Sequence, residues 1–333
     1  MTRGLVIGKF LPPHRGHQYL IDFARASTDD LTVQVCTLAR QSIPGRLRFE
    51  WMRQAFPDVN VVHNADENPE YPEDAPDTFW ETWRESLVRH LDAPPTHVFA
   101  SEAYGERLAV LFHARYVPVD PARSVLPVAG HAVLADPLTH WDALLPPARP
   151  YFLKRVAIVG PESSGKTVLA ARLAARLGTL WAPEYGRTYL DALPGPIDAP
   201  LMETVVRGHR ASEDALARQA TRVLISDTDP LVTQVWCEFL LGRVPPVVAE
   251  HVRTCSYGLT LLTDVTDSWV PGPQRFLPEM GERERFRDRC RELLTEHGRP
   301  YVLLSGSWEE REAAAIAAVA ALLGIAPKSP IAP

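Results

Sequence analysis

The stretch that decides the fold is Val156-Ala157-Ile158-Val159-Gly160-Pro161-Glu162-Ser163-Ser164-Gly165-Lys166-Thr167. Its last eight residues match G-x-x-x-x-G-K-[ST] at every fixed position. An apolar run precedes the match and a helix-like run follows it at 168–177, a context that predicts a phosphate-binding loop between a strand and a helix. The helix N-terminus adds a partial positive charge toward an anion. A Gly-rich turn without function is the alternative interpretation.

The side chains of this loop predict binding of ATP with Mg²⁺. Lys166 supplies a point charge for the β- and γ-phosphates, and the Thr167 hydroxyl is a ligand for the metal. Backbone N–H groups of the loop cradle the phosphates, because glycine lets them approach closely. The residues expected to contact the nucleotide are Gly160, Glu162, Ser163, Ser164, Gly165, Lys166 and Thr167.

A second apolar run, Val223-Leu224-Ile225-Ser226-Asp227-Thr228-Asp229, predicts a buried strand that ends in two acids. In proteins with a phosphate loop, a carboxylate at this position holds Mg²⁺ through water. We therefore expect Asp227 to share the metal with Thr167.

The stretch Glu184-Tyr185-Gly186-Arg187 follows a short strand-like run and predicts the acceptor side of the site. Glu184 is the candidate general base for an acceptor hydroxyl, with Asp227 as the alternative base. Tyr185, Arg187 and Asp229 are further candidate contacts of the acceptor. A simple salt bridge is the alternative role of Arg187.

A Pro- and Gly-rich loop from Trp269 to Arg275 precedes the charge-rich helical pattern at 282–292. This combination is typical of a kinase lid, with Arg275 as the candidate phosphate clamp and Trp269 as a candidate substrate contact. Arg283 or Arg285 could share the clamp, but a solvated helix face is the simpler interpretation of both.

The first half of the chain alternates strand-like and helix-like runs. Strands are predicted at 5–7, 31–37, 59–63, 97–100 and 116–119, and helices between them at 18–26, 47–56, 78–91 and 103–112. This alternation predicts a parallel sheet with helices on both faces, whose ligands bind beyond the carboxyl ends of the strands. The arginines at 46, 48 and 53 are expected on a solvated helix face.

The segment Gly8-Lys9-Phe10-Leu11-Pro12-Pro13-His14-Arg15-Gly16-His17 lies at that position, directly after the first strand. His14 and His17, at or near a helix start, can donate to phosphate oxygens while the helix dipole adds attraction. Lys9 and Arg15 add positive charge. The alternative interpretations are that the histidines cap the helix or that one of them ligates a metal.

Two other stretches of this half face the expected ligand edge. The acidic, aromatic loop at 64–83 includes Trp80, which could stack on a flat cationic base; a surface loop that packs its tryptophans against the sheet is the alternative. Arg123, in Asp120-Pro121-Ala122-Arg123-Ser124, is a candidate phosphate contact.

Composition excludes several classes of function. The 333 residues carry a net charge of −6, which gives no general footprint for nucleic acid, and no apolar run reaches the ~20 residues that span a bilayer. The beginning of the chain reads as a strand rather than a signal peptide. The four cysteines are scattered without Cys-x-x-Cys, which favours buried thiols in a reducing compartment. We expect a cytoplasmic protein.

The pattern Gly8-x-Phe10-x-Pro12-x-His14-x-Gly16-His17 resembles the signature of the nucleotidyltransferase superfamily, whose members transfer AMP or CMP and release pyrophosphate. The resemblance implies that His14 and His17 hold the triphosphate and that Gly8, Lys9, Phe10 and Arg123 belong to the same site. The family's second motif, Ile-Ser-x-Thr-x-x-Arg, falls on 127–134, where Ala129, His131 and Leu134 replace its serine, threonine and arginine.

Over residues 1–325 the motifs, in their order, resemble the NadR family of nicotinamide-nucleotide adenylyltransferases fused to ribosylnicotinamide kinases. The resemblance implies NAD salvage, with nicotinamide riboside, nicotinamide mononucleotide and ATP as partners. Some members carry an N-terminal helix-turn-helix; this sequence begins at the first strand, so DNA binding is not expected. The family's lid motif Trp-x-x-Asp-Gly-x-Arg keeps Trp269 and Arg275 here but lacks the aspartate.

These observations predict two doubly wound α/β domains: a nucleotidyltransferase, Rossmann-like domain at 1–148 and a P-loop kinase domain at 149–325, with a disordered tail at 326–333. The expected chemistry is phosphorylation of nicotinamide riboside, followed by adenylyl transfer. Two alternatives stay open: an active kinase whose first domain only senses nucleotides or forms a homo-oligomer, and a P-loop kinase for another nucleoside.

Overall fold

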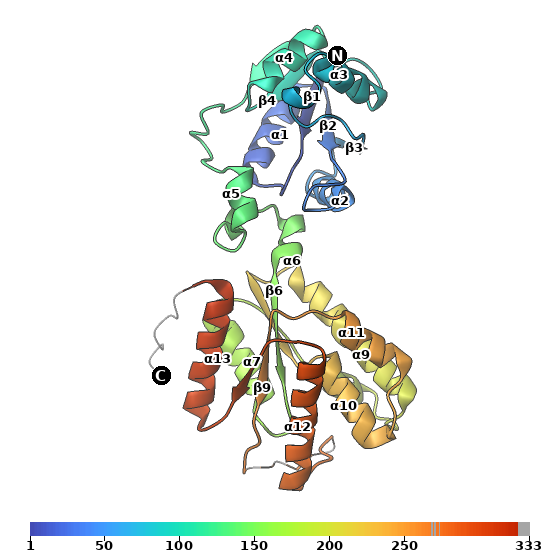
Figure 1. The fold of residues 1–333 in the computed structure, drawn as a ribbon, viewed down its shortest axis with the longest axis vertical. Helices are drawn as coiled ribbons and strands as arrows, with labels where there is room; N and C mark the ends of the chain where they lie inside the picture. The colour runs from blue at the N-terminus through green and yellow to red at the C-terminus, as the bar shows by residue number, and fades with distance from the viewer. Residues whose placement is uncertain (268, 270, 273, 326–333) are drawn as a thin grey trace. The chain divides into compact units, whose positions relative to one another are not determined.

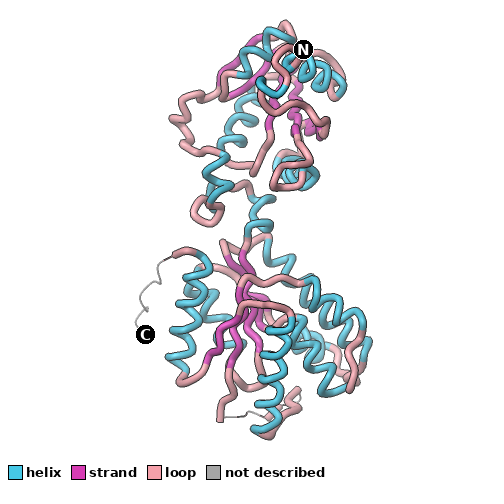
Figure 2. The backbone as a smooth tube through the Cα atoms, viewed as in Figure 1, coloured by secondary structure: helices cyan, strands magenta, loops and turns pink. Residues whose placement is uncertain are grey.

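The computed structural model describes the chain except for residues 268, 270, 273 and 326–333, so the predicted tail lies outside the described residues. The chain divides into two compact units, Met1–Phe152 (unit 1) and Leu153–Pro333 (unit 2). Each unit contains one five-stranded sheet with helices around it (Figure 1, Figure 2). The predicted fold class, two doubly wound parallel sheets, is confirmed.

Unit 1 is built on a sheet of strand order β3-β2-β1-β4-β5 in which all neighbours are parallel. Its strands are β1 (Arg3–Gly8), β2 (Asp30–Cys36), β3 (Asn60–Asn64), β4 (His97–Ala100) and β5 (Arg115–Pro118). Its helices are α1 (Arg15–Ser27), α2 (Gly45–Ala55), α3 (Phe79–Arg89), α4 (Tyr104–Leu111), α5 (Gly130–Ala135) and α6 (Arg149–Phe152), with short 3₁₀ turns η1 (Pro72–Asp74), η2 (Trp141–Ala143) and η3 (Pro146–Ala148).

The order of the strands determines where unit 1 binds a ligand. Strand β1 lies in the centre, with β2 on one side and β4 on the other, so the chain order reverses there. Val6 and Phe10 pack with Ile21 and Val33 in the core beneath this point. A crevice therefore opens at the carboxyl end of β1, where the segment from Gly8 to His17 leads into α1.

Unit 2 has the strand order β10-β9-β6-β8-β7, again all parallel. Its strands are β6 (Lys154–Val159), β7 (Trp181–Ala182), β8 (Val223–Asp227), β9 (Leu259–Thr263) and β10 (Tyr301–Leu304). Its helices are α7 (Lys166–Leu177), α8 (Tyr185–Ala192), α9 (Ala199–Ala217), α10 (Pro230–Leu241), α11 (Pro246–Thr254), α12 (Met280–Glu296) and α13 (Trp308–Leu323).

The phosphate loop follows the central strand of this sheet. Strand β6 pairs with β8 so that Ile158 lies opposite Asp227. The apolar side chains of β6 are fully buried, and Ala157 and Val159 join the core that contains Phe286 of α12. This register brings the acid at the end of β8 to the entrance of the loop.

The segment before β6 belongs to the packing of unit 1, although we expected the second domain to begin at residue 149. Trp141, Leu144 and Leu145 are buried, the Leu145 amide donates to the Pro13 carbonyl at 3.1 Å, and His14 forms a β-bridge with Leu144. In α6, Phe152 packs on Trp51 of α2. The first compact unit therefore ends after residue 152 rather than after residue 148.

Two arginines that we expected on solvated faces are buried. Arg48 is fully buried and donates to the carbonyls of Lys9 and Ile43 and to the Gln41 side chain, so it holds the segment after β1 in place. Arg283 is buried and donates to the Thr266 carbonyl at 2.9 Å. Short-range spacing does not reveal such contacts, because both acceptors are distant carbonyls. All four cysteines are free and buried, as predicted.

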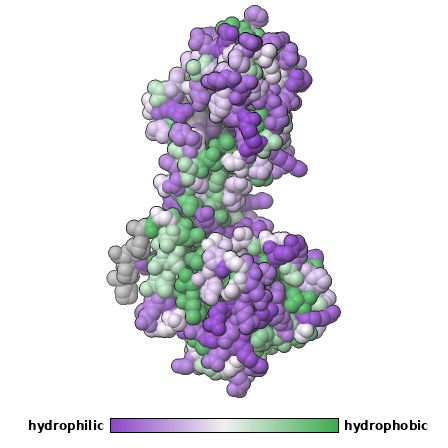
Figure 3. Space-filling view, in the orientation of Figure 1, coloured by the Kyte–Doolittle hydropathy of each residue, from purple (hydrophilic) through white to green (hydrophobic). Residues whose placement is uncertain are grey.

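The surface of unit 2 agrees with the pattern of its sequence. On the face drawn in Figure 3, hydrophilic residues predominate over α12, whose arginines pair with acids such as Asp264 and Glu238. Among the described residues, no helix combines the length and apolar character needed to cross a bilayer.

Candidate functional site

The phosphate loop in unit 2 depends on residues with left-handed backbone. The φ angles of Gly160, Ser163 and Gly165 are +137°, +60° and +86°. A Cβ on Gly160 would lie 2.3 Å from the Thr263 hydroxyl oxygen, so only glycine fits between β6 and β9. The loop is fastened to β9 by the 2.7 Å contact between the hydroxyls of Ser164 and Thr263. Its shape therefore exists before any nucleotide binds.

Lys166 lies inside the loop and is almost fully buried. Its ammonium donates to the Pro161 carbonyl at 2.7 Å. Burial lowers the pKa of Lys166 and the Arg275 guanidinium lowers it further, while the carboxylates of Glu184 and Asp227 act in the opposite direction. A desolvated ammonium held by one carbonyl is available to a phosphate, which is a stronger partner for it.

Thr167 and Asp227 meet as the sequence predicted. The Thr167 hydroxyl donates to Asp227 Oδ2 at 2.6 Å, and Oδ1 of the same carboxylate is buried without a hydrogen-bond partner among the described residues. Burial raises the pKa of Asp227, against the nearby Lys166 ammonium. An oxygen-only donor set with an unsatisfied buried carboxylate oxygen fits a hard divalent cation such as Mg²⁺. These two residues would hold it.

A small cavity of about 80 Å³ lies beside Lys166. Glu184, Arg187 and Arg275 line it together with Lys166. A ligand pocket usually needs ~300 Å³ or more, so a nucleoside can enter only when the lining side chains move apart. Glu184 and Arg187 pair at 3.2 Å, which is the salt bridge considered as the alternative role of Arg187.

The aromatic wall of this cavity depends on a glycine that sequence analysis did not select. Tyr185 lies against Gly208 of α9, where a Cβ would be 2.0 Å from the Tyr185 ring. His209, the next residue, also lines the cavity. The available sequence signal is a glycine inside a 19-residue helix. Glycine lowers the stability of a helix, so its presence there indicates a packing reason.

Glu162 and Trp269, which we expected to contact ATP and the substrate, form a hydrogen bond with each other. The Glu162 carboxylate accepts hydrogen bonds from Trp269 Nε1 at 2.8 Å and from the amides of Phe276 and Leu277, each at 2.9 Å. Its charge is therefore directed to the segment around Arg275 and Trp269, and only its backbone is left for ATP. Residues 270 and 273 of the predicted lid lie outside the described residues.

The contacts of Asp229 differ from the prediction that it binds the acceptor. Its side chain is fully buried, accepts from the Val232 amide at the start of α10, and pairs with Arg299 at 2.7 Å. It is absent from the described lining of the small cavity. A buried ion pair with a helix cap gives Asp229 a structural role in place of the expected substrate contact.

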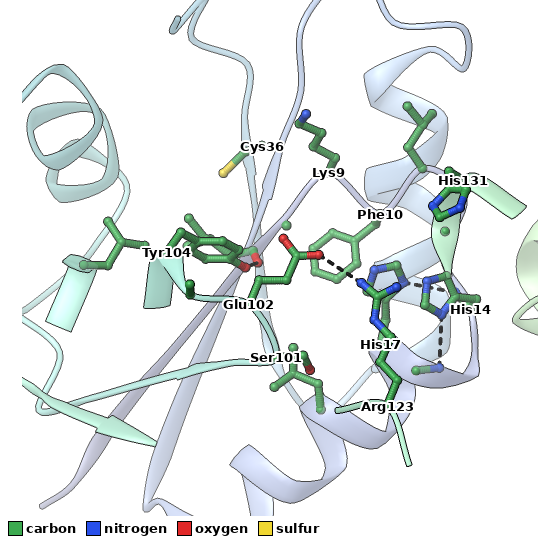
Figure 4. Close-up of a pocket in the computed structure, with 18 of the residues that line it drawn as sticks. Lys9, Phe10, His14, His17, Cys36, Ser101, Glu102, Tyr104, Arg123 and His131 are labelled. Carbon is green, nitrogen blue, oxygen red and sulfur yellow. Dashed lines mark hydrogen bonds and ion pairs between the residues drawn. The ribbon is translucent and has the colours of Figure 1, made fainter. Parts of the chain in front are cut away.

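A larger cavity of about 810 Å³ lies at the carboxyl end of β1 in unit 1 (Figure 4). Arg15 is exposed and absent from the described lining, but the other unit 1 residues selected from the sequence line the cavity: Gly8, Lys9, Phe10, His14, His17, Trp80 and Arg123. In Figure 4, His14 and His17 lie together on one side, with Arg123 beside them. The volume is within the range of small-molecule sites.

The two histidines of this cavity cap α1 and still keep one nitrogen each for a ligand. His14 Nδ1 accepts from the Gly16 amide at 3.1 Å, and His17 Nδ1 accepts from the His14 amide at 3.2 Å. The rings stack with centroids 3.8 Å apart. Because Nδ1 accepts in both neutral rings, the proton is on Nε2, which can donate to a phosphate oxygen.

Both rings are neutral at physiological pH. Burial lowers the pKa of His14 to about 4, and the Arg123 guanidinium contributes. Burial also lowers the pKa of His17 well below its ordinary value, with His14 and Arg123 adding to the effect. The capping alternative from the sequence is therefore true of Nδ1, and it is compatible with phosphate binding by Nε2.

Arg123 is positioned by a loop whose key residue we did not predict. Arg123 itself has a φ of +51°, and its guanidinium pairs with Glu102 at 3.2 Å. The Asp120 carboxylate accepts from the hydroxyl and amide of Ser124 and from the amides of Val125 and Leu126. The aspartate before Pro121 was the available signal, since Asp in such a position often organises a turn.

Lys9 faces the acidic, aromatic loop. Its ammonium pairs with Glu70 at 2.7 Å and lies over the Tyr71 ring at 5.3 Å, and Glu70 also pairs with Arg40 at 2.7 Å. Trp83 packs below and donates to the Pro69 carbonyl at 2.9 Å. Both interpretations of this loop therefore have support, because Trp80 and Trp83 pack against the core of unit 1 and also line the cavity.

The segment with the altered second motif also reaches this cavity. Ala129 precedes α5, and Gly130, His131 and Leu134 line the cavity. A Cβ on Gly130 would lie 3.4 Å from His14 Nε2, so the backbone of this turn approaches the histidine closely. The position of the motif is retained, while its hydroxyls and guanidinium are absent.

Fold and sites together define a class of protein: an α/β protein with a nucleotidyltransferase-like unit followed by a P-loop kinase-like unit. A family model described as an AAA domain matches residues 155–311. This match covers the phosphate loop, Glu184, Asp227 and Arg275.

Known proteins narrow this class. The trifunctional NAD biosynthesis/regulator protein NadR of Escherichia coli (strain K12) is 29% identical over 327 residues, which cover 90% of this chain and 78% of that protein. The protein of the same name from Salmonella typhimurium is 28% identical over 325 residues, with the same coverage. The chain is thus a homologue of the NadR proteins, and the resemblance seen in its motifs is confirmed.

Solved structures agree on the fold. A NadR protein in complex with NAD and AMP-PNP superposes with a TM-score of 0.81 at 20% identity, covering 99% of this chain and 98% of that one. A NadR protein in complex with NR gives the same TM-score and identity over 98% of each chain.

Proposed function

We propose that this chain is a bifunctional enzyme of NAD salvage, in which unit 2 phosphorylates nicotinamide riboside and unit 1 adenylylates the resulting mononucleotide. The observation that carries the proposal is that one chain holds both a phosphate loop with its Thr167–Asp227 pair and a cavity with two neutral Nε2–H donors. The NadR protein of Escherichia coli, to which this chain is similar over 90% of its length, is named for NAD biosynthesis. ATP with Mg²⁺ is the proposed donor.

In unit 2, the 5′-hydroxyl of the riboside attacks the γ-phosphorus of ATP, and the bond to the β,γ-bridging oxygen breaks. Glu184, or Asp227 in its place, takes the hydroxyl proton. Lys166 and Arg275 stabilise the charge on the transferred phosphoryl group. Thr167 and Asp227 would hold Mg²⁺, which would supply charge neutralisation at the β- and γ-phosphates. Tyr185 and Trp269 are the proposed contacts of the nucleoside, with Arg187 released from Glu184 toward phosphate.

In unit 1, a phosphate oxygen of the mononucleotide attacks the α-phosphorus of ATP, and pyrophosphate leaves. His14 and His17 donate through Nε2 to the triphosphate, and Arg123 and Lys9 supply positive charge near it. No covalent nucleophile is required, because positioned donors stabilise the charge that develops on the leaving group. Trp80 is the proposed platform for the pyridine base.

One observation favours a second function for unit 1. Ala129 and Leu134 stand where the transferases carry a phosphate-binding serine and arginine. Loss of such charge-assisted contacts costs several kcal/mol in a catalytic site. Unit 1 would then bind the nucleotide as a sensor or form an oligomer, and the kinase in unit 2 would act alone. We propose the cytoplasm as the compartment, because all four thiols are free.

A survey of products resolved by mass tests the proposal. Protein, ATP, Mg²⁺ and nicotinamide riboside should give nicotinamide mononucleotide and ADP first, and NAD with pyrophosphate afterwards. Kinase turnover without pyrophosphate release from ATP plus nicotinamide mononucleotide would favour the sensor. Other ribonucleosides tested in parallel should be poor acceptors; preference for one of them would replace the proposed substrate.

A further inference from the structure

Glu162 is the acidic side chain of the phosphate loop, and it is only 4% exposed. A carboxylate at this position repels a bound triphosphate unless its charge is engaged. Oε1 accepts from Trp269 Nε1 and from the Leu277 amide, and Oε2 accepts from the Phe276 amide. All three donors belong to the chain near Arg275, so the role of the carboxylate lies there.

Arg275 directly precedes the two amides that Glu162 holds. Its side chain lines the same cavity as Lys166 and Glu184. The location of Arg275 in space is therefore coupled to the phosphate loop through the next two peptide groups. A small displacement of these peptides would move the guanidinium away from the phosphoryl group that passes between the donor and the acceptor.

Other contacts hold this part of the chain against different elements. Leu277 is buried in the core of unit 2, the Phe276 ring packs on Trp236 with centroids 5.8 Å apart, and Gln274 donates to Asp191 at 2.7 Å. These contacts fasten the chain to the helices. Glu162 adds a direct link to the phosphate loop, and its hydrogen bonds are charge-assisted and buried, so they hold strongly.

We infer that Glu162 is a positioning residue for phosphoryl transfer: through the amides of Phe276 and Leu277 it fixes Arg275 relative to the phosphate loop. The inference rests on the proposed kinase activity of unit 2. It assigns the carboxylate to the protein's own chain instead of to ATP or Mg²⁺. The effect on the reaction passes through Arg275, because Glu162 itself does not touch the transferred group.

Hydrogen exchange tests the link without any substrate. Glu162→Gln keeps the size of the side chain but loses its charge and one acceptor oxygen. We expect the amides of Phe276 and Leu277 to exchange about tenfold faster or more in this variant, since they lose charge-assisted partners. Glu284→Gln, at an exposed position of α12, is the matched control and should leave both amides unchanged. Equal protection in all three proteins would overturn the inference.

A double-mutant cycle on riboside phosphorylation tests the route through Arg275. Glu162→Gln should lower kcat about 10- to 100-fold, since a ~1 Å misplacement can cost ~100-fold. Adding Glu162→Gln to Arg275→Ala should cause little further loss, because the first residue acts through the second. Losses that multiply would overturn the inference. An unmodified protein without kinase turnover would contradict the proposed function instead, and the exchange measurement would then decide on Glu162.

Discussion

His14 and His17 use the two nitrogens of each ring for different tasks. Nδ1 accepts a backbone hydrogen bond at the start of α1, which fixes the ring and leaves Nε2–H toward the cavity. The neutral state is essential to this arrangement, because a protonated ring could not accept at Nδ1. Burial enforces the neutral state, and so the proposed phosphate donors of unit 1 are also the caps of its first helix.

This arrangement predicts a pH-dependent stability. The folded pKa of His14 is about 4, below its ordinary 6.5, so the unfolded chain binds the proton more readily. The free energy of unfolding is therefore not reduced by His14 above pH 6.5, and it falls as the pH drops from 6.5 toward 4. By linkage, His14 should account for about 2 kcal/mol lost between pH 7.5 and pH 5. Chemical denaturation at both pH values checks this.

The control is His14→Asn, which replaces the cap with a good capping residue that does not titrate. The difference in unfolding free energy between pH 7.5 and pH 5 should shrink in this variant. Some pH dependence should remain in this variant, because burial lowers the pKa of His17 in the same direction. An unchanged pH dependence would show that His14 is already accessible to protons in the folded protein.

The contacts of Asp227 predict how the proposed kinase reaction depends on magnesium. Asp227→Asn keeps an acceptor for the Thr167 hydroxyl but removes the carboxylate whose second oxygen has no protein partner. We expect kcat to fall about 100-fold or more and the half-saturating Mg²⁺ concentration to rise. Magnesium titrations of the kinase reaction measure both, and chelation should stop the reaction in the unmodified protein. Asp214→Asn, on the exposed side of α9, should behave as the unmodified protein; a normal magnesium response in Asp227→Asn would refute the assignment.

At the scale of elements, Gly208 of α9 makes room for the Tyr185 ring, the proposed contact of the nucleoside. Gly208→Ala should raise helix propensity by about 1 kcal/mol but force the Tyr185 ring out of its place, since the new Cβ would lie 2.0 Å from it. We expect KM for the riboside to rise about tenfold while the melting temperature does not fall. Steady-state kinetics and thermal unfolding give the two values.

The control for this prediction is Gly281→Ala, in α12, where a Cβ meets nothing within 4 Å. It should change neither KM nor kcat, because it adds the same methyl group to a helix without displacing a neighbour. If Gly208→Ala also leaves KM unchanged, Tyr185 does not form part of the substrate wall.

The elements of this chain were predictable where local patterns determine them. The predicted strands overlap β1 to β6 and β8, and the predicted helical run at 168–177 lies within α7 (Lys166–Leu177). We did not predict α10 and α11, whose proline starts interrupt the helical pattern. We also ended the first domain at residue 148, because sequence spacing does not show that Phe152 packs on Trp51 of α2.

The site residues divide in the same way. Motif spacing identified Lys166, Thr167 and Asp227, since the register of β6 and β8 follows from the fold class. Spacing could not show that Glu162 turns to the chain near Arg275, or that Asp229 pairs with Arg299, because those partners lie 70 to 115 positions away and are brought together by tertiary packing. A sequence motif gives the place of a side chain on an element and leaves its partner open.

At the scale of the whole molecule, each unit has its own sheet, core and cavity. Because each site is held by its own sheet and core, a substitution in one site should lower the activity of that site alone. Lys166→Ala should lower riboside phosphorylation at least ~1,000-fold, because it removes the charge that stabilises the transferred group, and leave adenylyl transfer within about twofold. His17→Ala should do the reverse, with at least ~100-fold loss of pyrophosphate release.

The measurement is to assay each reaction with its own substrate, so that the product of one site is never required by the other. Nicotinamide riboside with ATP reports on unit 2, and nicotinamide mononucleotide with ATP reports on unit 1. Folding of both variants is checked by thermal unfolding, since His17 also closes the cap of α1 and its loss lowers the stability of unit 1. Loss of both activities in a folded Lys166→Ala protein would mean that the kinase site supports the transferase, and the two units would then have to be treated as one catalytic system. Retention of kinase turnover in His17→Ala, with no pyrophosphate release in the unmodified protein either, would instead leave unit 1 as the nucleotide sensor.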